Sequence, residues 1–152
     1  MVVDFENYAT KGNEFIRIVA LQLEVPRDMA GRITRAVLHA LRNRLSVEES
    51  LHFVAQLPMA IKSIYVDGWK IANPFYRVRG IHDFLNEIRK EDGKLSGYDF
   101  GNDARAEKAA AAVFKAVGYF VSEGEIDDLS KMLPADIGTF VKISALQHTE
   151  HL

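Results

Sequence analysis

The chain has 152 residues, a formal net charge of -2 and no cysteine. Hydrophobic residues make up 48% and charged residues 26%, a composition that is typical of globular domains and excludes disorder along the whole chain. The absence of cysteine excludes disulfides, thiol nucleophiles and cysteine zinc sites, and the small net charge predicts no bulk attraction to nucleic acid. Because Asp4 and Glu6 precede any apolar run, we expect no membrane segment and predict a soluble, cytoplasmic protein.

The first half of the chain has the apolar spacing of helices. One stripe predicts a long helix and consists of Phe5, Tyr8, Phe15, Ile16, Val19 and Leu23. A second stripe at intervals of three and four consists of Ile33, Val37, Ala40, Leu41 and Leu45. Ser46 and Glu49 then form a predicted capping box, which starts a short helix that carries Leu51, Val54 and Leu57.

The dipeptide Leu57-Pro58 follows that short helix. Proline has no amide proton and restricts the residue before it, but it is favourable at the start of a new helix. We therefore predict that a helix ends with a buried Leu57, and that another begins at Pro58 and carries Ile61, Ile64 and Tyr65.

The second half repeats this order 76 residues later. Laying residues 29–66 on residues 105–142 needs no gap and gives nine identities in 38 positions, among them Leu133-Pro134. The matching stripe is Ala109, Val113, Ala116, Val117 and Val121, and Ser122 with Glu125 predicts a second capping box. The first helix of this half is shorter, with a stripe from Ile81 to Ile88, and glycines 93, 97 and 101 predict a loop of about ten residues over 92–103.

Three stretches resemble a bacterial family known as domain of unknown function 2267. They are LPMAIKSIYVDGW at 57–69, IHDFLNEI at 81–88 and SEGEIDDLSKMLPADI at 122–137. The resemblance implies an all-helical tandem repeat. It implies no activity and transfers no catalytic residue, and the loop over 92–103 departs from the family pattern.

A basic stripe lies on the second predicted helix. Arg32, Arg35, His39 and Arg42 follow steps of three, four and three, which places them on one side, opposite the apolar stripe. Four such donors can bind phosphates or an acidic helix, although single-sign stripes also occur as solvated faces. The corresponding residues of the second half are Lys108, Ala111, Lys115 and Gly118. Any such site therefore belongs to the first half.

The connector between the halves combines aromatic and cationic residues, namely Trp69, Phe75 and Tyr76 with Lys70, Arg77 and Arg79. Such aromatic residues can stack bases or form a partner groove, and Trp69 and Tyr76 are the binding candidates. The alternative is that they fasten the connector to the core beneath. His148 and His151 are close in sequence but lie in the last five residues, so we predict a frayed end there and no metal site.

We predict one all-α domain over residues 1–152, built from two tandem four-helix units, 1–76 and 77–152, whose apolar faces share a core or abut. The predicted function is a non-catalytic helical interaction module that binds a partner protein or a second copy of the chain. The alternative is anion or nucleic-acid binding through the basic stripe, and the third hypothesis is an enzyme with an unrecognised site. No cofactor and no membrane contact are expected.

Overall fold

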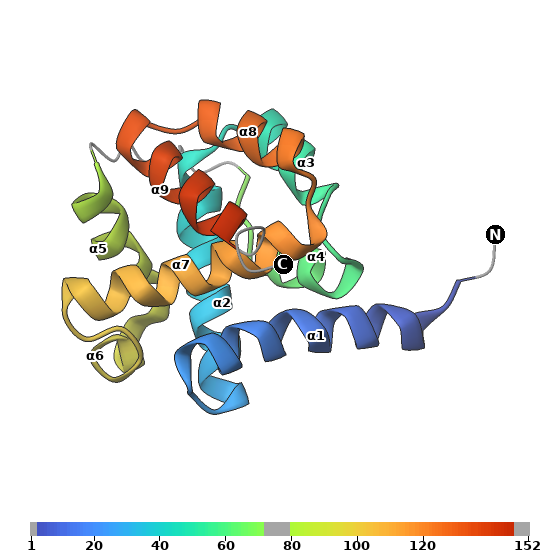
Figure 1. The fold of residues 1–152 in the computed structure, drawn as a ribbon, viewed down its shortest axis with the longest axis horizontal. Helices are drawn as coiled ribbons and strands as arrows, with labels where there is room; N and C mark the ends of the chain where they lie inside the picture. The colour runs from blue at the N-terminus through green and yellow to red at the C-terminus, as the bar shows by residue number, and fades with distance from the viewer. Residues whose placement is uncertain (1–2, 72–79, 148–152) are drawn as a thin grey trace.

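The computed structural model describes residues 3–71 and 80–147, and within these ranges every regular element is a helix and none is a strand (Figure 1). This confirms the predicted all-helical class. The first range contains α1 (Phe5–Leu23), α2 (Arg27–Arg44), α3 (Val47–Val54) and α4 (Met59–Val66). The second contains α5 (Ile81–Asp92), the 3-10 turn η1 (Gly93–Leu95), α6 (Ser96–Asp99), α7 (Asp103–Phe120), α8 (Glu123–Lys131) and α9 (Ala135–Leu146).

Polar side chains fix the amino ends of several helices, where the first backbone amides have no partner within the helix. The Asp4 carboxylate accepts a hydrogen bond from the Asn7 amide at the start of α1, and Asn102 caps α7 in the same way. The predicted capping box at α3 is complete. Ser46 Oγ accepts from the Glu49 amide at 3.1 Å, and the Glu49 carboxylate accepts from the Ser46 amide at 2.9 Å.

The capping box predicted at α8 is only half formed. Ser122 Oγ accepts a hydrogen bond from the Glu125 amide at 3.3 Å. The carboxylate of Glu125, however, lies 2.9 Å from Nε2 of His52 on α3. The prediction was therefore wrong for the glutamate, because a side chain from a distant helix competes with the local backbone amide for the carboxylate.

Both Leu-Pro dipeptides separate two helices, as predicted. Pro58 and Pro134 are the N-cap residues of α4 and α9, with ψ of 146° and 147°, so the helices begin at the residues after them. Leu57 and Leu133 are buried, with exposed fractions of 3% and 7%. Each dipeptide therefore anchors the chain in the core and turns it into the next helix.

The segment from 92 to 103 is mostly helical, which corrects the predicted loop. Helix α5 continues to Asp92, and η1 and α6 follow directly. Gly93 and Gly101 have φ of 69° and 58°, so the glycines mark chain reversals at the two ends of this segment. The side chains of Asp99 and Phe100 are buried and fix the segment to the body of the protein.

Apolar residues from both ranges form one core cluster. All ten residues of the two matched stripes, on or next to α2 and α7, are buried in it. Leu51, one of the apolar residues expected on the short helix α3, is 55% exposed. Ser50 faces inward in its place, and its hydroxyl is 2.7 Å from that of Tyr65.

The helices of the two ranges interlock (Figure 1). Helix α1 packs against α7, α5 packs against α2, and α2 touches α7 between them. Helix α9 lies on α7 and also contacts α8, while the amino end of α1 points away from the body (Figure 1). None of the helices in the two described ranges is both long and apolar enough to cross a bilayer.

Candidate functional site

Arg32 of the basic stripe joins α2 to α6. Its Nε and Nη2 atoms donate to the two carboxylate oxygens of Asp99, each at 2.9 Å, and Nη1 lies 3.4 Å from Asp28. The Asp99 side chain is fully buried, so this two-point pair is shielded from water on the side of the acid. The guanidinium group is therefore committed to an internal carboxylate.

The remaining members of the stripe bind the end of α4. Arg35 pairs with Asp67 and holds the pKa of that carboxyl below its usual value. His39 is buried, its Nε2 lies 2.7 Å from the Ile64 carbonyl oxygen, and burial lowers the pKa of its imidazole. These contacts close the carboxyl end of α4 onto α2.

Arg42 is buried and completes this arrangement. Its Nη1 donates to the carbonyl oxygens of Tyr65 and Asp67 at 2.7 and 3.0 Å, which satisfies two acceptors at the end of α4. The guanidinium carbon lies 5.9 Å from the centre of the Trp69 ring, and that ring meets Tyr65 edge-on.

The sequence candidates thus come together along α2 and the end of α4, with Trp69 over Arg42. Tyr76 lies outside the described residues. The stripe is not a continuous solvated face, because His39 and Arg42 are 4% and 8% exposed. A phosphate would have to displace Asp99 or Asp67 to reach the arginines, so the arrangement favours fastening of helices over anion binding.

Sequence analysis missed a second carboxyl beside Asp99, that of the half-buried Asp92. The Oδ2 atom of Asp92 is buried, and no N–H group of the described residues donates a hydrogen bond to it. The Asp92 side chain lies close enough to Asp99 for the two carboxyl groups to affect each other's pKa. Burial and the neighbouring carboxylate raise the pKa of Asp92 to about 7. Burial opposes ionisation of Asp99 too, but hydrogen bonds from Arg32 and Asp92 lower its pKa overall. These opposite shifts favour one proton held between the two acids, beside one arginine.

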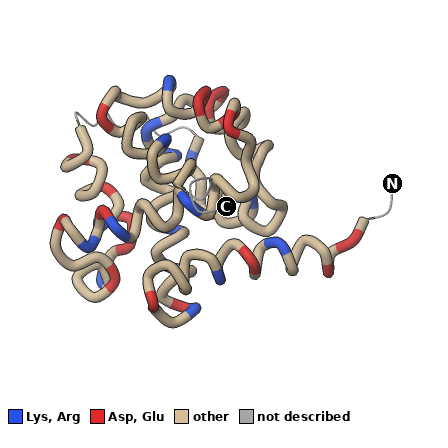
Figure 2. The backbone as a smooth tube through the Cα atoms, in the orientation of Figure 1, with Lys and Arg blue, Asp and Glu red and all other residues tan. Residues whose placement is uncertain are grey.

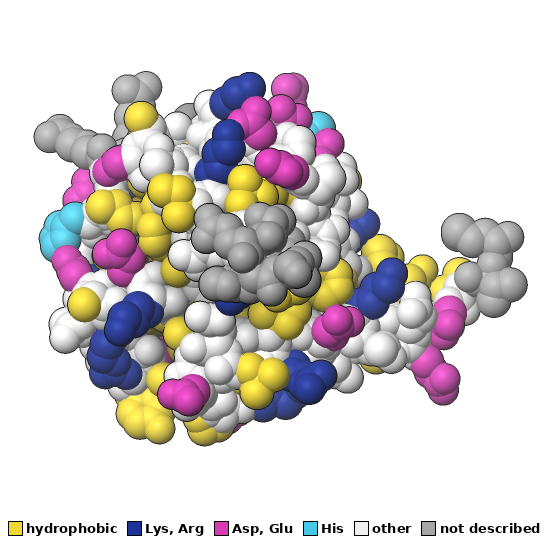
Figure 3. All heavy atoms as spheres, viewed as in Figure 1, with side chains coloured by type: hydrophobic (Ala, Val, Ile, Leu, Met, Phe, Trp, Pro, Cys, Tyr) yellow, Lys and Arg dark blue, Asp and Glu magenta, His cyan; other side chains and the backbone are white. Residues whose placement is uncertain are grey.

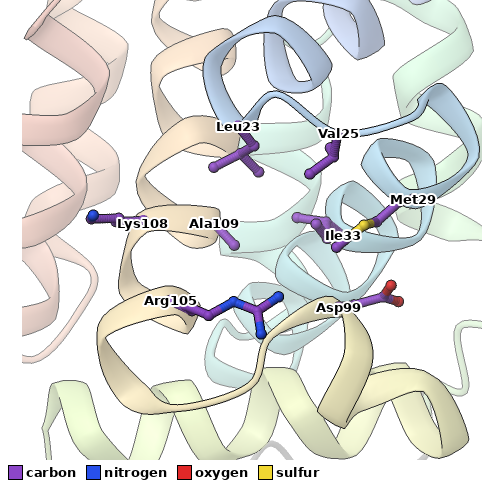
Figure 4. Close-up of a pocket in the computed structure, with 8 residues that line it drawn as sticks. All are labelled: Leu23, Val25, Met29, Ile33, Asp99, Arg105, Lys108 and Ala109. Atoms are coloured by element: carbon purple, nitrogen blue, oxygen red, sulfur yellow. The ribbon is translucent and has the colours of Figure 1, made fainter.

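A small cavity lies between α1, α2 and α7 (Figure 4). Its volume is about 160 Å³, and Leu23, Val25, Met29 and Ile33 form much of its wall. Arg105 points into it, whereas the Asp99 carboxylate points away from Arg105 (Figure 4). Pockets that bind small molecules usually measure roughly 300–1,000 Å³. The cavity is below that range, and its charged groups do not converge on a common point.

The larger hollow is a trough formed by α7, α9 and the carboxyl end of α1. It consists of three adjoining depressions of about 310, 400 and 490 Å³, which share Lys108, Ala111, Ile143 and Gln147 between them. We call it the α7–α9 trough, and its lining residues are Gln22, Leu23, Ala104, Glu107, Lys108, Ala111, Ala112, Lys115, Thr139, Phe140, Lys142, Ile143, Ser144, Leu146 and Gln147. Figure 3 shows hydrophobic side chains at several places on this side of the molecule, with charged side chains between them.

The chemistry of the α7–α9 trough is an apolar floor with a basic margin. Ala111, Phe140 and Ile143 supply apolar surface, and the Ile143 side chain is 59% exposed. On the α1 side, Lys115 Nζ donates to Gln22 at 3.0 Å. Lys142 on the opposite side pairs with Asp127 at 2.7 Å. A surface of this kind can accept the apolar side of a helix.

Sequence analysis did not identify the trough, because its lining residues come from helices that are distant in the sequence. On α9, Val141 is fully buried, whereas Phe140 is only partly buried and packs at the margin of the core. Ile143 lies two residues beyond Val141 and therefore on another face of α9. Apolar residues on more than one face of a helix were the available signal.

Comparison with protein families gives one match. The profile of a family described as "Uncharacterized conserved protein (DUF2267)" matches residues 12–140, which is most of the chain. The curated proteins contain no match to this sequence. The expected family resemblance is therefore confirmed, and the family description assigns no site.

Proposed function

The chain belongs to the DUF2267 family, and from that premise we propose that it is a non-catalytic interaction module whose α7–α9 trough docks an acidic amphipathic helix of a partner protein. The observation that carries this proposal is the exposed apolar floor around Ile143, with lysines at its margin. Apolar surface left open beside charged groups is typical of interaction sites.

The dimensions of the trough suit a short helix. From Ala104 to Lys115 it extends along α7 for about 16 Å, the length of about eleven helical residues. A docked helix would place apolar residues at intervals of three and four against Ala111, Phe140 and Ile143. The trough thus has room for about three turns, in agreement with helix-in-groove recognition.

The lysines that line the trough favour a partner helix of negative charge. Lys108 and Lys115 are seven residues apart on α7, so they project from the same side two turns apart. Both lysines line the trough. Glu107 is the acidic residue that α7 contributes to the lining. A partner with acidic residues two turns apart would match the two lysines, which favours an acidic helix over a basic one.

The test uses two synthetic amphipathic peptides with leucines at helical spacing, one flanked by glutamates and one by lysines. Fluorescence anisotropy with the full chain should show binding of the acidic peptide in preference to the basic one. Ile143→Asp should weaken binding at least about tenfold, or 1.4 kcal/mol. Leu51→Asp is the matched control, because Leu51 is similarly exposed at 55% but lies outside the trough.

Two further measurements separate the possible occupants. A chain that ends at Gln147 tests whether the five residues that follow compete with the peptide. Sedimentation at high concentration tests whether a second copy of the chain occupies the trough. In that case the chain would form an oligomer, and Ile143→Asp would dissociate it. Equal effects of Ile143→Asp and Leu51→Asp on peptide binding, or no binding at all, would disprove the docking proposal.

Anion binding through the basic stripe stays the alternative, and the observation in its favour is that Arg35 is 49% exposed beside Asp67. It predicts salt-dependent retention on heparin that Arg35→Glu abolishes. Retention that Arg35→Glu leaves unaltered would exclude this alternative.

We also propose that the two halves are copies of one four-helix unit. Helices α5, α7, α8 and α9 begin at Ile81, Asp103, Glu123 and Ala135, each 76 residues after the first residue of α1, α2, α3 and α4. The helix contacts also support a repeat. The first helix of each half packs on the second helix of the other half, α1 on α7 and α5 on α2. The trough between α7 and α9 then belongs to the second copy, where α9 is four residues longer than α4.

A further inference from the structure

The ends of α3 and α8 bring together three groups that can bind a metal ion. His52 lies in the last turn of α3, and Glu125 and Asp128 lie on α8. One donor atom from each lies within 4.8 Å of the other two. Figure 2 marks several acidic positions along the backbone at the top of the molecule, where Figure 1 places α3 beside α8.

The Glu125 carboxylate contacts a different group from the one that Glu49 contacts in α3. In α3 the corresponding Glu49 carboxylate accepts a hydrogen bond from the amide of its own capping serine. In α8 only the serine makes its bond, and the Glu125 carboxylate lies 2.9 Å from His52 Nε2. The glutamate is therefore directed toward an imidazole nitrogen on another helix.

The geometry is close to that of a zinc site. Zinc binds imidazole nitrogen and carboxylate oxygen at about 2.0–2.2 Å, so two ligands of a tetrahedral ion lie about 3.4 Å apart. His52 Nε2 and Glu125 Oε2 are closer than this, at 2.9 Å, and one oxygen of the exposed Asp128 lies within 4.8 Å of each. Binding would therefore need small movements of these side chains. Two carboxylates would also balance the charge of a divalent cation.

We propose that His52, Glu125 and Asp128 form a binding site for a divalent cation of the zinc class, which links α3 to α8. The imidazole selects transition metals over magnesium, because magnesium prefers oxygen ligands and retains its water. Three protein ligands leave a fourth position open for water. The site is separate from the α7–α9 trough and does not depend on the docking proposal.

The competing explanation is a simple ion pair. His52 and Glu125 have side chains that are 50% and 28% exposed, and pairs of this kind contribute little to stability. An ion pair makes no use of Asp128 and responds to no metal. The two explanations therefore differ in what added zinc does and in whether Asp128 matters.

The experiment uses the full chain with His148→Ala and His151→Ala, which removes the imidazoles of the terminal segment. Zinc chloride is titrated by calorimetry in a buffer that does not bind metals, and Co²⁺ absorption reports the ligand geometry. We expect one ion per chain and a rise in the melting temperature on addition of zinc. His52→Ala should weaken binding at least about tenfold, because loss of even an outer-shell partner costs 10–100-fold.

Two further variants make the result decisive. Asp128→Asn leaves the His52–Glu125 pair intact and should still weaken zinc binding and reduce the thermal shift. His82→Ala is the matched control, because His82 is an exposed histidine that pairs with Asp103 beside the cation Arg89, and its loss should leave zinc affinity unchanged. Absence of one-to-one binding, or binding unaffected by both His52→Ala and Asp128→Asn, would overturn the proposal, as would magnesium binding as tightly as zinc.

Discussion

The Asp92 carboxyl holds a proton at pH values where an ordinary aspartate has lost it. Its pKa is raised from 3.8 to about 7, first by burial and then by the neighbouring Asp99. Arg32 donates to both oxygens of Asp99, so the arginine neutralises one of the two acids. The second acid is best accommodated as a neutral group that donates to the first.

This arrangement predicts a pH dependence of stability with a definite sign. Between pH 3.8 and about 7 the folded chain retains a proton on Asp92 that the unfolded chain has released. The contribution of Asp92 to the free energy of unfolding should therefore fall as pH rises through this window and level off above it. Asp92→Asn should remove this part of the profile, since its amide can still donate to Asp99 but does not titrate.

Urea unfolding of both proteins from pH 4 to pH 8 measures this difference. The stability of Asp92→Asn relative to the wild type should increase with pH across the window. The control is Asp28→Asn, which removes an exposed acid 3.4 Å from the same arginine. Parallel profiles for Asp92→Asn and the wild type would show that Asp92 ionises freely in the folded state.

At the scale of helices, Arg42 and Gly118, which the proposed repeat would pair, make different contacts. They are 76 residues apart, on α2 and α7. Helix α4 ends at Val66, and Arg42 fills the space beyond it and binds the terminal carbonyl groups. Helix α9 continues to Leu146, and Gly118 allows its backbone to approach α7. A Cβ atom at Gly118 would lie 1.8 Å from the Ala145 carbonyl oxygen.

We therefore expect Gly118→Ala to force α9 away from α7. The backbone of α9 cannot yield as a flexible side chain can, so the cost should be at the upper end of overpacking, about 3 kcal/mol or more. Thermal unfolding measures the loss. Gly31→Ala is the matched control, because a Cβ there has nothing within 4 Å and alanine favours the helix by up to about 1 kcal/mol. Equal effects of the two substitutions would contradict the close contact.

The helices themselves could be predicted from the sequence, because their signals are local. Apolar spacing predicted the buried faces of α2 and α7, and Leu57-Pro58 and Leu133-Pro134 predicted two boundaries. The role of Gly118 could not be predicted in the same way. A glycine within a helix lowers the stability of that helix, and its benefit becomes visible only when the helix that packs against it is known. The glycines over 92–103 were assigned to a loop because their composition does not distinguish a chain reversal from an extended loop.

The candidate sites were less predictable, because they join distant parts of the chain. His52 and Glu125 are 73 residues apart, and nothing local to either indicates the other. The residues of the basic stripe lie on α2, but the partners Asp99 and Asp67 come from other elements. Sequence spacing gives the direction of a side chain on its own helix and leaves open which helix packs against it.

In the molecule as a whole, the first helix of each half packs on the long second helix of the other half, which is α2 or α7. Helix α1 packs on α7 through Phe15 and Phe120, whose rings are stacked at 5.9 Å. Helix α5 packs on α2 and also reaches α7, where Phe84 lies 6.4 Å from Phe114. Removal of either half would expose the apolar stripe of the other. Cooperative unfolding of the described ranges as one unit follows from this exchange.

Trp69, the single tryptophan, provides a probe of the first half that tests this cooperativity. Phe114 is fully buried in the second half, and Phe114→Ala should cost about 3–5 kcal/mol. We expect the urea midpoint of Trp69 fluorescence to fall together with that of far-UV circular dichroism, although Phe114 lies on α7. Tyr98→Ala, which removes an aromatic side chain that is 65% exposed, should move neither midpoint. If Trp69 fluorescence kept its midpoint while the dichroism split into two transitions, the halves would fold independently, and the exchange of helices would contribute little to stability.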